Sequence, residues 1–110
     1  LQNQELKEFD QESVNFEIKR AYFGKNLFEK IPKLNKYTTL EMLSIEYNKI
    51  EKLSNSSDLP SNITYFYLSY NLIEFIENEY FLNFKLIIGI DMSNNKLKSI
   101  SNLFFYITHA

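Results

Sequence analysis

The sequence predicts an α/β fold of stacked repeats in which short parallel strands form one sheet. Three observations predict it. A pattern of 14 residues occurs four times along the chain. Each copy begins with apolar and polar residues in alternation, which is typical of a short strand with one buried face. Each copy also carries an asparagine at the same place, after which the apolar residues follow at wider spacing.

The clearest copy spans residues 40–53. Leu43 and Ile45 lie on one side of a short strand that begins at Met42. Asn48 then ends the strand, and the apolar residues after it direct their side chains at the same core while the backbone turns away.

The other copies keep this register. The asparagines are separated by 22, 23 and 24 residues, and four matches at such regular intervals indicate a true repeat. Because a single copy buries too few apolar side chains to offset its ordering entropy, neighbouring copies must stack and pair their strands. The four copies span residues 18–31, 40–53, 63–76 and 87–100.

These copies resemble the leucine-rich repeat family, whose L-x-x-L-x-L-x-x-N-x-L-x-x-L signature runs from Ile18 to Ile100, with Ala21 and Phe66 at leucine positions. The resemblance implies an α/β solenoid, here a horseshoe segment. Its short parallel strands would lie on the concave face, and the convex side would be irregular or short-helical. Phe81 and Phe105 look like the convex-side phenylalanine of a class common in extracellular members. This gives a slight preference for an extracellular or ectodomain location over a cytoplasmic one.

The repeat register predicts a single domain over residues 1–110. Residues 1–17 fit a partial or flanking repeat, with Gln4 in place of the asparagine. An alternative for this region is an amphipathic helix from Leu6 through Val14 that caps the array. The residues after Ile100 are apolar and offer no polar cap, so we expect the sequence to be an excerpt of a longer array. The repeats are residues 18–39, 40–62, 63–86 and 87–110.

Composition excludes several classes of function. With a net charge of −2 and a pI near 5.4, the chain has no strong attraction for nucleic acid. It contains no cysteine, which excludes disulfides and thiolate metal sites, and no apolar run of about 18 residues for membrane insertion. His109 has no acidic or serine partner in a recognisable arrangement, and a glycine-rich phosphate loop is missing. We therefore expect no enzyme, no cofactor and no metal.

The repeated asparagines are expected to be structural. A side-chain amide offers two donors and an acceptor, which can satisfy backbone groups left unpaired where each strand ends. Stacked side by side they should form an internal ladder of Asn26, Asn48, Asn71 and Asn95.

Function is expected from the side chains that the strands direct away from the core. Equivalent positions of the four copies give a tyrosine-rich surface bounded by cations and carboxylates. Tyrosine and arginine are enriched at binding hot spots, so we predict a protein partner on the concave face. The predicted contact residues are Arg20, Tyr22, Met42, Ser44, Glu46, Tyr65, Tyr67, Ser69 and Asp91.

Alternatives remain open. The segment could be purely structural within a larger receptor or effector, or the aromatic strip could recognise a glycan or lipid. Tyr47 and Tyr70, just before the asparagine, are expected to pack along the sheet edge. The glycosylation patterns at Asn55 and Asn62 are readily explained by chance in an asparagine-rich chain. The sequence does not decide the oligomeric state.

Overall fold

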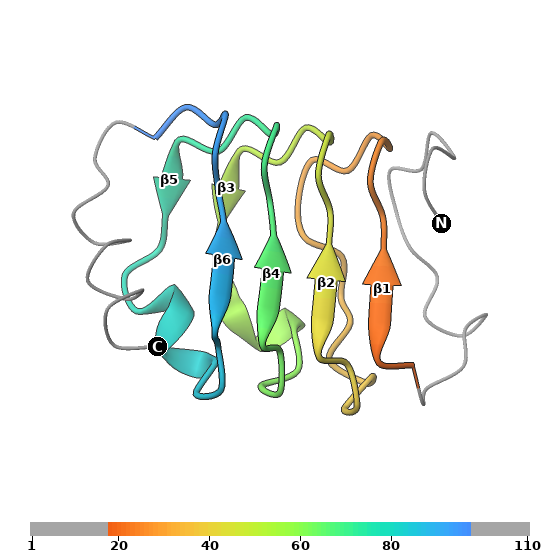
Figure 1. The fold of residues 1–110 in the computed structure, drawn as a ribbon. Coiled ribbons are helices and arrows are strands. Elements are labelled where there is room, and N and C mark those ends of the chain that lie inside the picture. The colour runs from red at the N-terminus through yellow and green to blue at the C-terminus, as the bar shows by residue number, and fades with distance from the viewer. Residues whose placement is uncertain (1–17, 98–110) are drawn as a thin grey trace.

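The computed structural model describes residues 18–97. Within this range four three-residue strands lie side by side in chain order and form one parallel sheet (Figure 1). The middle residues of these strands are register partners, so that Ala21, Leu43, Phe66 and Ile90 form one row. The parallel sheet expected from the sequence is therefore confirmed. Its strands are β1 (Arg20–Tyr22), β2 (Met42–Ser44), β4 (Tyr65–Tyr67) and β6 (Gly89–Asp91).

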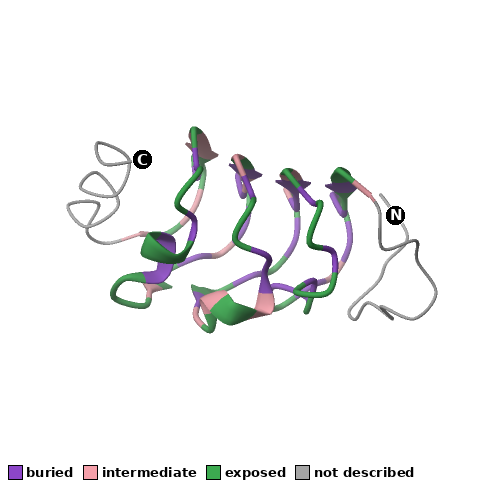
Figure 2. Cartoon of the chain, turned by 90° about the horizontal axis from the view of Figure 1, so that it is seen from below, coloured by how far each residue is buried: buried purple, intermediate pink, exposed green. Residues whose placement is uncertain are grey.

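A second layer is built from the segments that return between these strands. β3 (Lys52–Leu53) and β5 (Phe75–Ile76) pair in parallel in a separate two-stranded sheet, behind the first and pointing the opposite way in Figure 1. Two short 3₁₀ helices, η2 (Ser56–Asp58) and η3 (Tyr80–Asn83), follow them in the chain. Figure 2 shows the four strands along one side of the molecule and the return segments along the other.

The core lies between the two layers. Leu43 and Ile45, predicted on the buried side of their strand, have no exposed surface, and neither has Phe66 at a position where the repeat has leucine. The last described strand is less well covered: Ile90 is half-buried and packs against the edge of the core. Other side chains with no exposed surface are Leu34, Tyr37, Leu40, Ile50, Leu53, Ile63, Leu68 and Ile73.

Each strand of the main sheet is followed by a turn of the same geometry. The residue just before each repeat asparagine has a positive φ, between 56° and 58°. This left-handed conformation is uncommon for residues other than glycine. It bends the chain at the end of the strand, and the side chain of the following asparagine bonds to the carbonyl oxygen three residues before it. The four residues are Lys25, Tyr47, Tyr70 and Asn94.

Aromatic side chains fill the return layer near η3. Tyr80 contacts Phe81 edge to face at 5.2 Å between ring centroids and Phe84 at 5.8 Å. The Tyr80 hydroxyl is buried and has no hydrogen-bond partner among the described residues. Burial, and after it the nearby carboxylates of Asp58 and Glu77, raises the pKa of the Tyr80 phenol above its ordinary value. This hydroxyl is an uncompensated polar group in an apolar cluster.

Some sequence expectations lie outside the described residues. They include the partial repeat with Gln4, the alternative helix from Leu6 through Val14, and the end of the last repeat with Phe105 and His109. Within residues 18–97, no helix has both the length and the apolar character needed to cross a bilayer.

Candidate functional site

The asparagine side chains connect neighbouring strand ends inside the molecule. The Asn71 Nδ2 donates to the carbonyl oxygens of Ile45 and Leu68, both at 3.0 Å, and its Oδ1 accepts from the backbone N–H of Ile50 at 3.1 Å. One amide thereby satisfies three backbone groups, of which two belong to the preceding repeat.

Asn48 and Asn95 make the corresponding bonds one repeat before and one repeat after. Asn48 accepts from the N–H of Phe28 at 3.0 Å, and Asn95 accepts from the N–H of Ile73, also at 3.0 Å. The amide nitrogens donate to carbonyl oxygens of their own and the preceding segment, and Asn26 donates to the Phe23 oxygen at 2.9 Å. Asn26, Asn48 and Asn71 are buried and Asn95 is partly buried, so these amides serve the fold.

The candidate site is the outer face of the main sheet, which is the face turned away from the core. Its residues come from the positions that alternate with the buried ones, and the register sets them in rows across the strands. Arg20, Tyr22, Tyr65 and Asp91 are exposed, whereas Met42, Glu46 and Tyr67 are partly buried. The two serines of the predicted set, Ser44 and Ser69, are buried.

Ser44 and Ser69 are buried, with 6% and 2% of their surfaces exposed, although we expected them to be displayed. Both hydroxyls donate to the Glu46 carboxylate, Ser44 to Oε1 at 3.0 Å and Ser69 to Oε2 at 2.6 Å. The Glu46 side chain therefore covers the two serines. Their role in this structure is to fix Glu46 and not to present a hydroxyl.

Tyr65 is exposed and yet held in place. A Cβ atom on Gly89 of the neighbouring strand would lie 3.0 Å from Cδ1 of the Tyr65 ring, so the ring occupies the space that a side chain there would take. On its own strand Tyr65 is nearly parallel to Tyr67, at 11° and 6.3 Å between centroids. The residue keeps 40% of its surface exposed.

A second aromatic pair lies where the strands end. The rings of Tyr47 and Tyr70 are stacked, with centroids 4.5 Å apart and planes 5° from parallel. Nearly half of each side chain remains exposed. We call Tyr22, Tyr47, Tyr65, Tyr67 and Tyr70 together the tyrosine surface.

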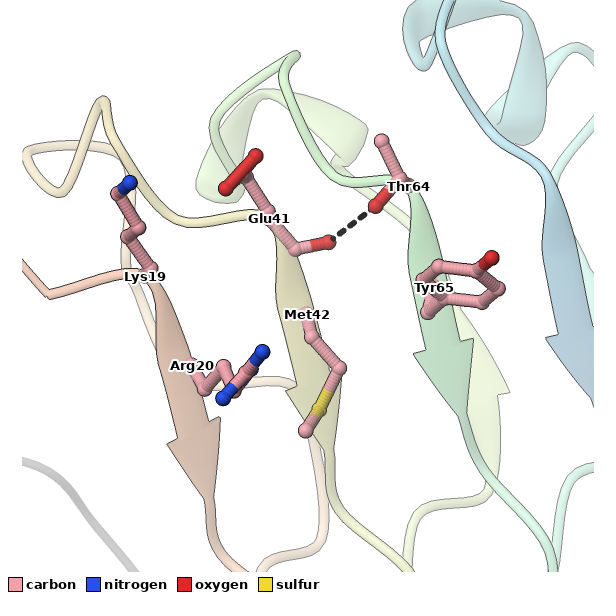
Figure 3. Close-up of a pocket in the computed structure, with 6 residues that line it drawn as sticks. All are labelled: Lys19, Arg20, Glu41, Met42, Thr64 and Tyr65. Carbon is pink, nitrogen blue, oxygen red and sulfur yellow. Dashed lines mark hydrogen bonds between the residues drawn. The ribbon is translucent and has the colours of Figure 1, made fainter.

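A depression of about 480 Å³ opens beside this surface, at the start of β1, β2 and β4 (Figure 3). Its polar side chains differ in whether they already have bonding partners. The Thr64 hydroxyl donates to the backbone oxygen of Glu41 at 3.0 Å, while Lys19 and Arg20 form no ion pair among residues 18–97. Thr64 was not singled out by the sequence, because nothing in its pattern distinguishes it from an ordinary strand residue. The lining residues are Lys19, Arg20, Glu41, Met42, Thr64 and Tyr65.

The described part of the chain contains no cluster of three or more acidic, histidine or cysteine side chains that could hold a metal ion. Asp91 accepts from the Ser93 backbone N–H at 3.0 Å and from its hydroxyl at 2.8 Å. At the glycosylation pattern of Asn62, the amide nitrogen donates to the Thr38 oxygen at 2.8 Å, so a glycan would remove an existing bond.

No family model matches the chain, and no curated protein matches its sequence.

Proposed function

We propose that the chain is a segment of a leucine-rich repeat solenoid that binds another protein through the outer face of its main sheet, which would be the concave face. The proposal is supported by four parallel strands in chain order and by asparagines that join each strand end to the one before it. The family signature at matching positions of all four copies adds to this support.

The observation that carries the binding proposal is the ordered exposure of the tyrosine surface. Tyr65 rests over Gly89, and Tyr47 and Tyr70 stack on each other, so these rings are ordered before any partner arrives. Ordering of interface side chains is one of the costs of association, and rings already fixed avoid most of it. Tyrosine adds a large contact area with a polar tip and is frequent among hot-spot residues.

The fixed carboxylate of Glu46 supports the same proposal. It is held by two buried hydroxyls within the same face as Tyr65 and Tyr67. A charge in a defined position contributes to selectivity, because a partner must match it or lose affinity.

The test is a capture experiment with the double variant Tyr65→Ala/Tyr67→Ala. The matched control is Phe75→Ala, which removes an exposed aromatic ring from β5 in the other layer. We expect the wild type and the control to recover a protein that the double variant does not recover, although the melting temperature of the double variant is unchanged. After purification, this protein should bind the wild type again.

Two results would contradict the proposal. If the double variant recovers the same proteins as the wild type, the segment is structural and its ligand site lies elsewhere. If no protein depends on the two rings but immobilised glycans or lipid vesicles bind in a ring-dependent way, the partner is not a protein.

A further inference from the structure

We propose that the depression at the start of strands β1, β2 and β4 receives an acidic side chain of the partner protein, with the Arg20 guanidinium as its anchor. This inference rests on the proposed function and adds the chemistry of the partner segment at that end of the sheet. It follows from the charged side chains that line the depression and from their hydrogen-bond partners.

Two carboxylates of the outer face already accept hydrogen bonds within the chain. Glu46 accepts from the hydroxyls of Ser44 and Ser69, and Asp91 accepts twice from Ser93. Neither of these two carboxylates lines the depression.

Among residues 18–97, two cations of the same face have no such partners. Arg20 and Lys19 are adjacent and exposed, and neither makes a salt bridge within the described residues. Glu41 lines the same depression without pairing to either of them. In Figure 3 the Arg20 guanidinium is directed toward Met42, while the Glu41 carboxylate points away from it. Two cations and one carboxylate line the depression, so its net charge is positive and complements a carboxylate.

The depression is large enough to receive an acidic side chain, because its volume of about 480 Å³ lies within the range of sites for whole small ligands. The flexible thioether of Met42 and the ring of Tyr65 provide apolar walls for the stem of that side chain. The Thr64 hydroxyl is already used, so Arg20 and Lys19 are left to bind the acidic head. A guanidinium can make two parallel hydrogen bonds to a carboxylate.

The first experiment selects displayed random peptides in parallel on the immobilised full chain and on its Arg20→Glu variant. The wild type should enrich peptides with Asp or Glu near aromatic residues. The variant should lose this enrichment and favour Lys or Arg, because its anchor charge is reversed.

The second experiment measures the affinity of the best wild-type peptide for single variants by fluorescence polarisation. Arg20→Gln should weaken binding about tenfold or more, since a charge-assisted pair is lost. Lys52→Gln, which removes an exposed cation from β3 in the other layer, should bind as the wild type does. The difference between Arg20→Gln and wild type should shrink as salt is added.

The outcomes separate this inference from the proposed function. If peptide binding needs Tyr65 and Tyr67 but is unchanged in Arg20→Gln, the tyrosine surface binds and the acidic anchor is wrong. If neither change matters, both proposals fail. A wild-type chain that selects no peptide, or peptides without acidic enrichment, also overturns the inference.

Discussion

Asn71 is the residue at which the link between neighbouring repeats can be tested most simply. Replacing it by Ala leaves the Ile50 N–H without its partner. The Ile45 and Leu68 carbonyl oxygens each lose one bond but keep another, from the amides of Asn48 and Asn95. A buried polar group without a partner costs about 1–3 kcal/mol, so the variant should lose about that much free energy of unfolding. Urea denaturation followed by circular dichroism measures it.

The control for this change is Asn83→Ala. Asn83 is exposed and makes a single long bond of 3.4 Å to Ser56. We expect this variant to stay within about 0.5 kcal/mol of the wild type. Equal stability of the two variants would mean that the amides inside the molecule do not hold it together.

Tyr80 offers the opposite test, because removing its hydroxyl should stabilise the protein. The hydroxyl is buried without a partner among the described residues. Tyr80→Phe removes this penalty and keeps the ring contacts, so the free energy of unfolding should rise by about 1 kcal/mol. A clear loss of stability would show that the hydroxyl has a partner.

The pH dependence of the same variant gives a second readout. Burial holds the pKa of Tyr80 above its ordinary value of 10.0 in the folded protein, so above that pH the unfolded chain loses a proton that the folded protein keeps. The proton-linked contribution of Tyr80 to the free energy of unfolding is full below pH 10. It falls by about 1.4 kcal/mol per pH unit above it. Unfolding measured from pH 8 to 11 should show a smaller decline in Tyr80→Phe than in the wild type.

Single residues differ in how far the sequence predicts them. The positions of Asn26, Asn48, Asn71 and Asn95 follow from spacing, since a repeat places equivalent residues in equivalent surroundings. The burial of Ser69 does not, because it depends on a hydrogen bond to Glu46, 23 residues earlier, and on the rotamer of that side chain. No pattern in the sequence encodes such a contact.

Among the structural elements, the strand ends carry a consistent backbone cost. Lys25, with φ of 58°, adopts the left-handed conformation that disfavours residues with a Cβ. Lys25→Gly should relieve this cost and raise the free energy of unfolding by up to about 1 kcal/mol. Lys25→Val should lower it, because β-branched side chains tolerate this conformation least. Thermal unfolding of the two variants provides the measurement. A Lys25→Val variant more stable than Lys25→Gly would contradict the turn geometry.

The main strands were predictable, whereas the second sheet was not. Alternation of apolar and polar residues marks β2 because Leu43 and Ile45 need one buried face. β3 and β5 have two residues each, too few to show a period, and they pair across 23 residues of sequence. The connector of residues 77–84 contains neither proline nor glycine, which permits a helical turn, and η3 lies within it.

The tyrosine surface arises at the scale of the whole molecule. Repeats of 22 to 24 residues bring equivalent positions side by side, so a tyrosine in one repeat lies next to the residue at the same position of the next. Tyr47 and Tyr70 stack for this reason, although they are 23 residues apart. The sequence predicts which residues share a row, while their exposure and ring geometry require the coordinates.

The order of the strands is the claim on which the tyrosine surface and its acidic anchor both depend. The chain has no cysteine, so pairs of introduced thiols report it cleanly. Met42 and Tyr65 are register partners on adjacent strands, roughly 4.8 Å apart, whereas Arg20 and Tyr65 are separated by one more strand at about twice that spacing. Both pairs can be treated with a short bimane reagent that fluoresces on bridging two thiols.

The bridging yield of these two variants is the most direct measurement. The account predicts rapid intramolecular bridging of Met42→Cys/Tyr65→Cys and little bridging of Arg20→Cys/Tyr65→Cys, with wild-type circular dichroism in both. Equal bridging of the two pairs, or failure of the first in a folded protein, would contradict it.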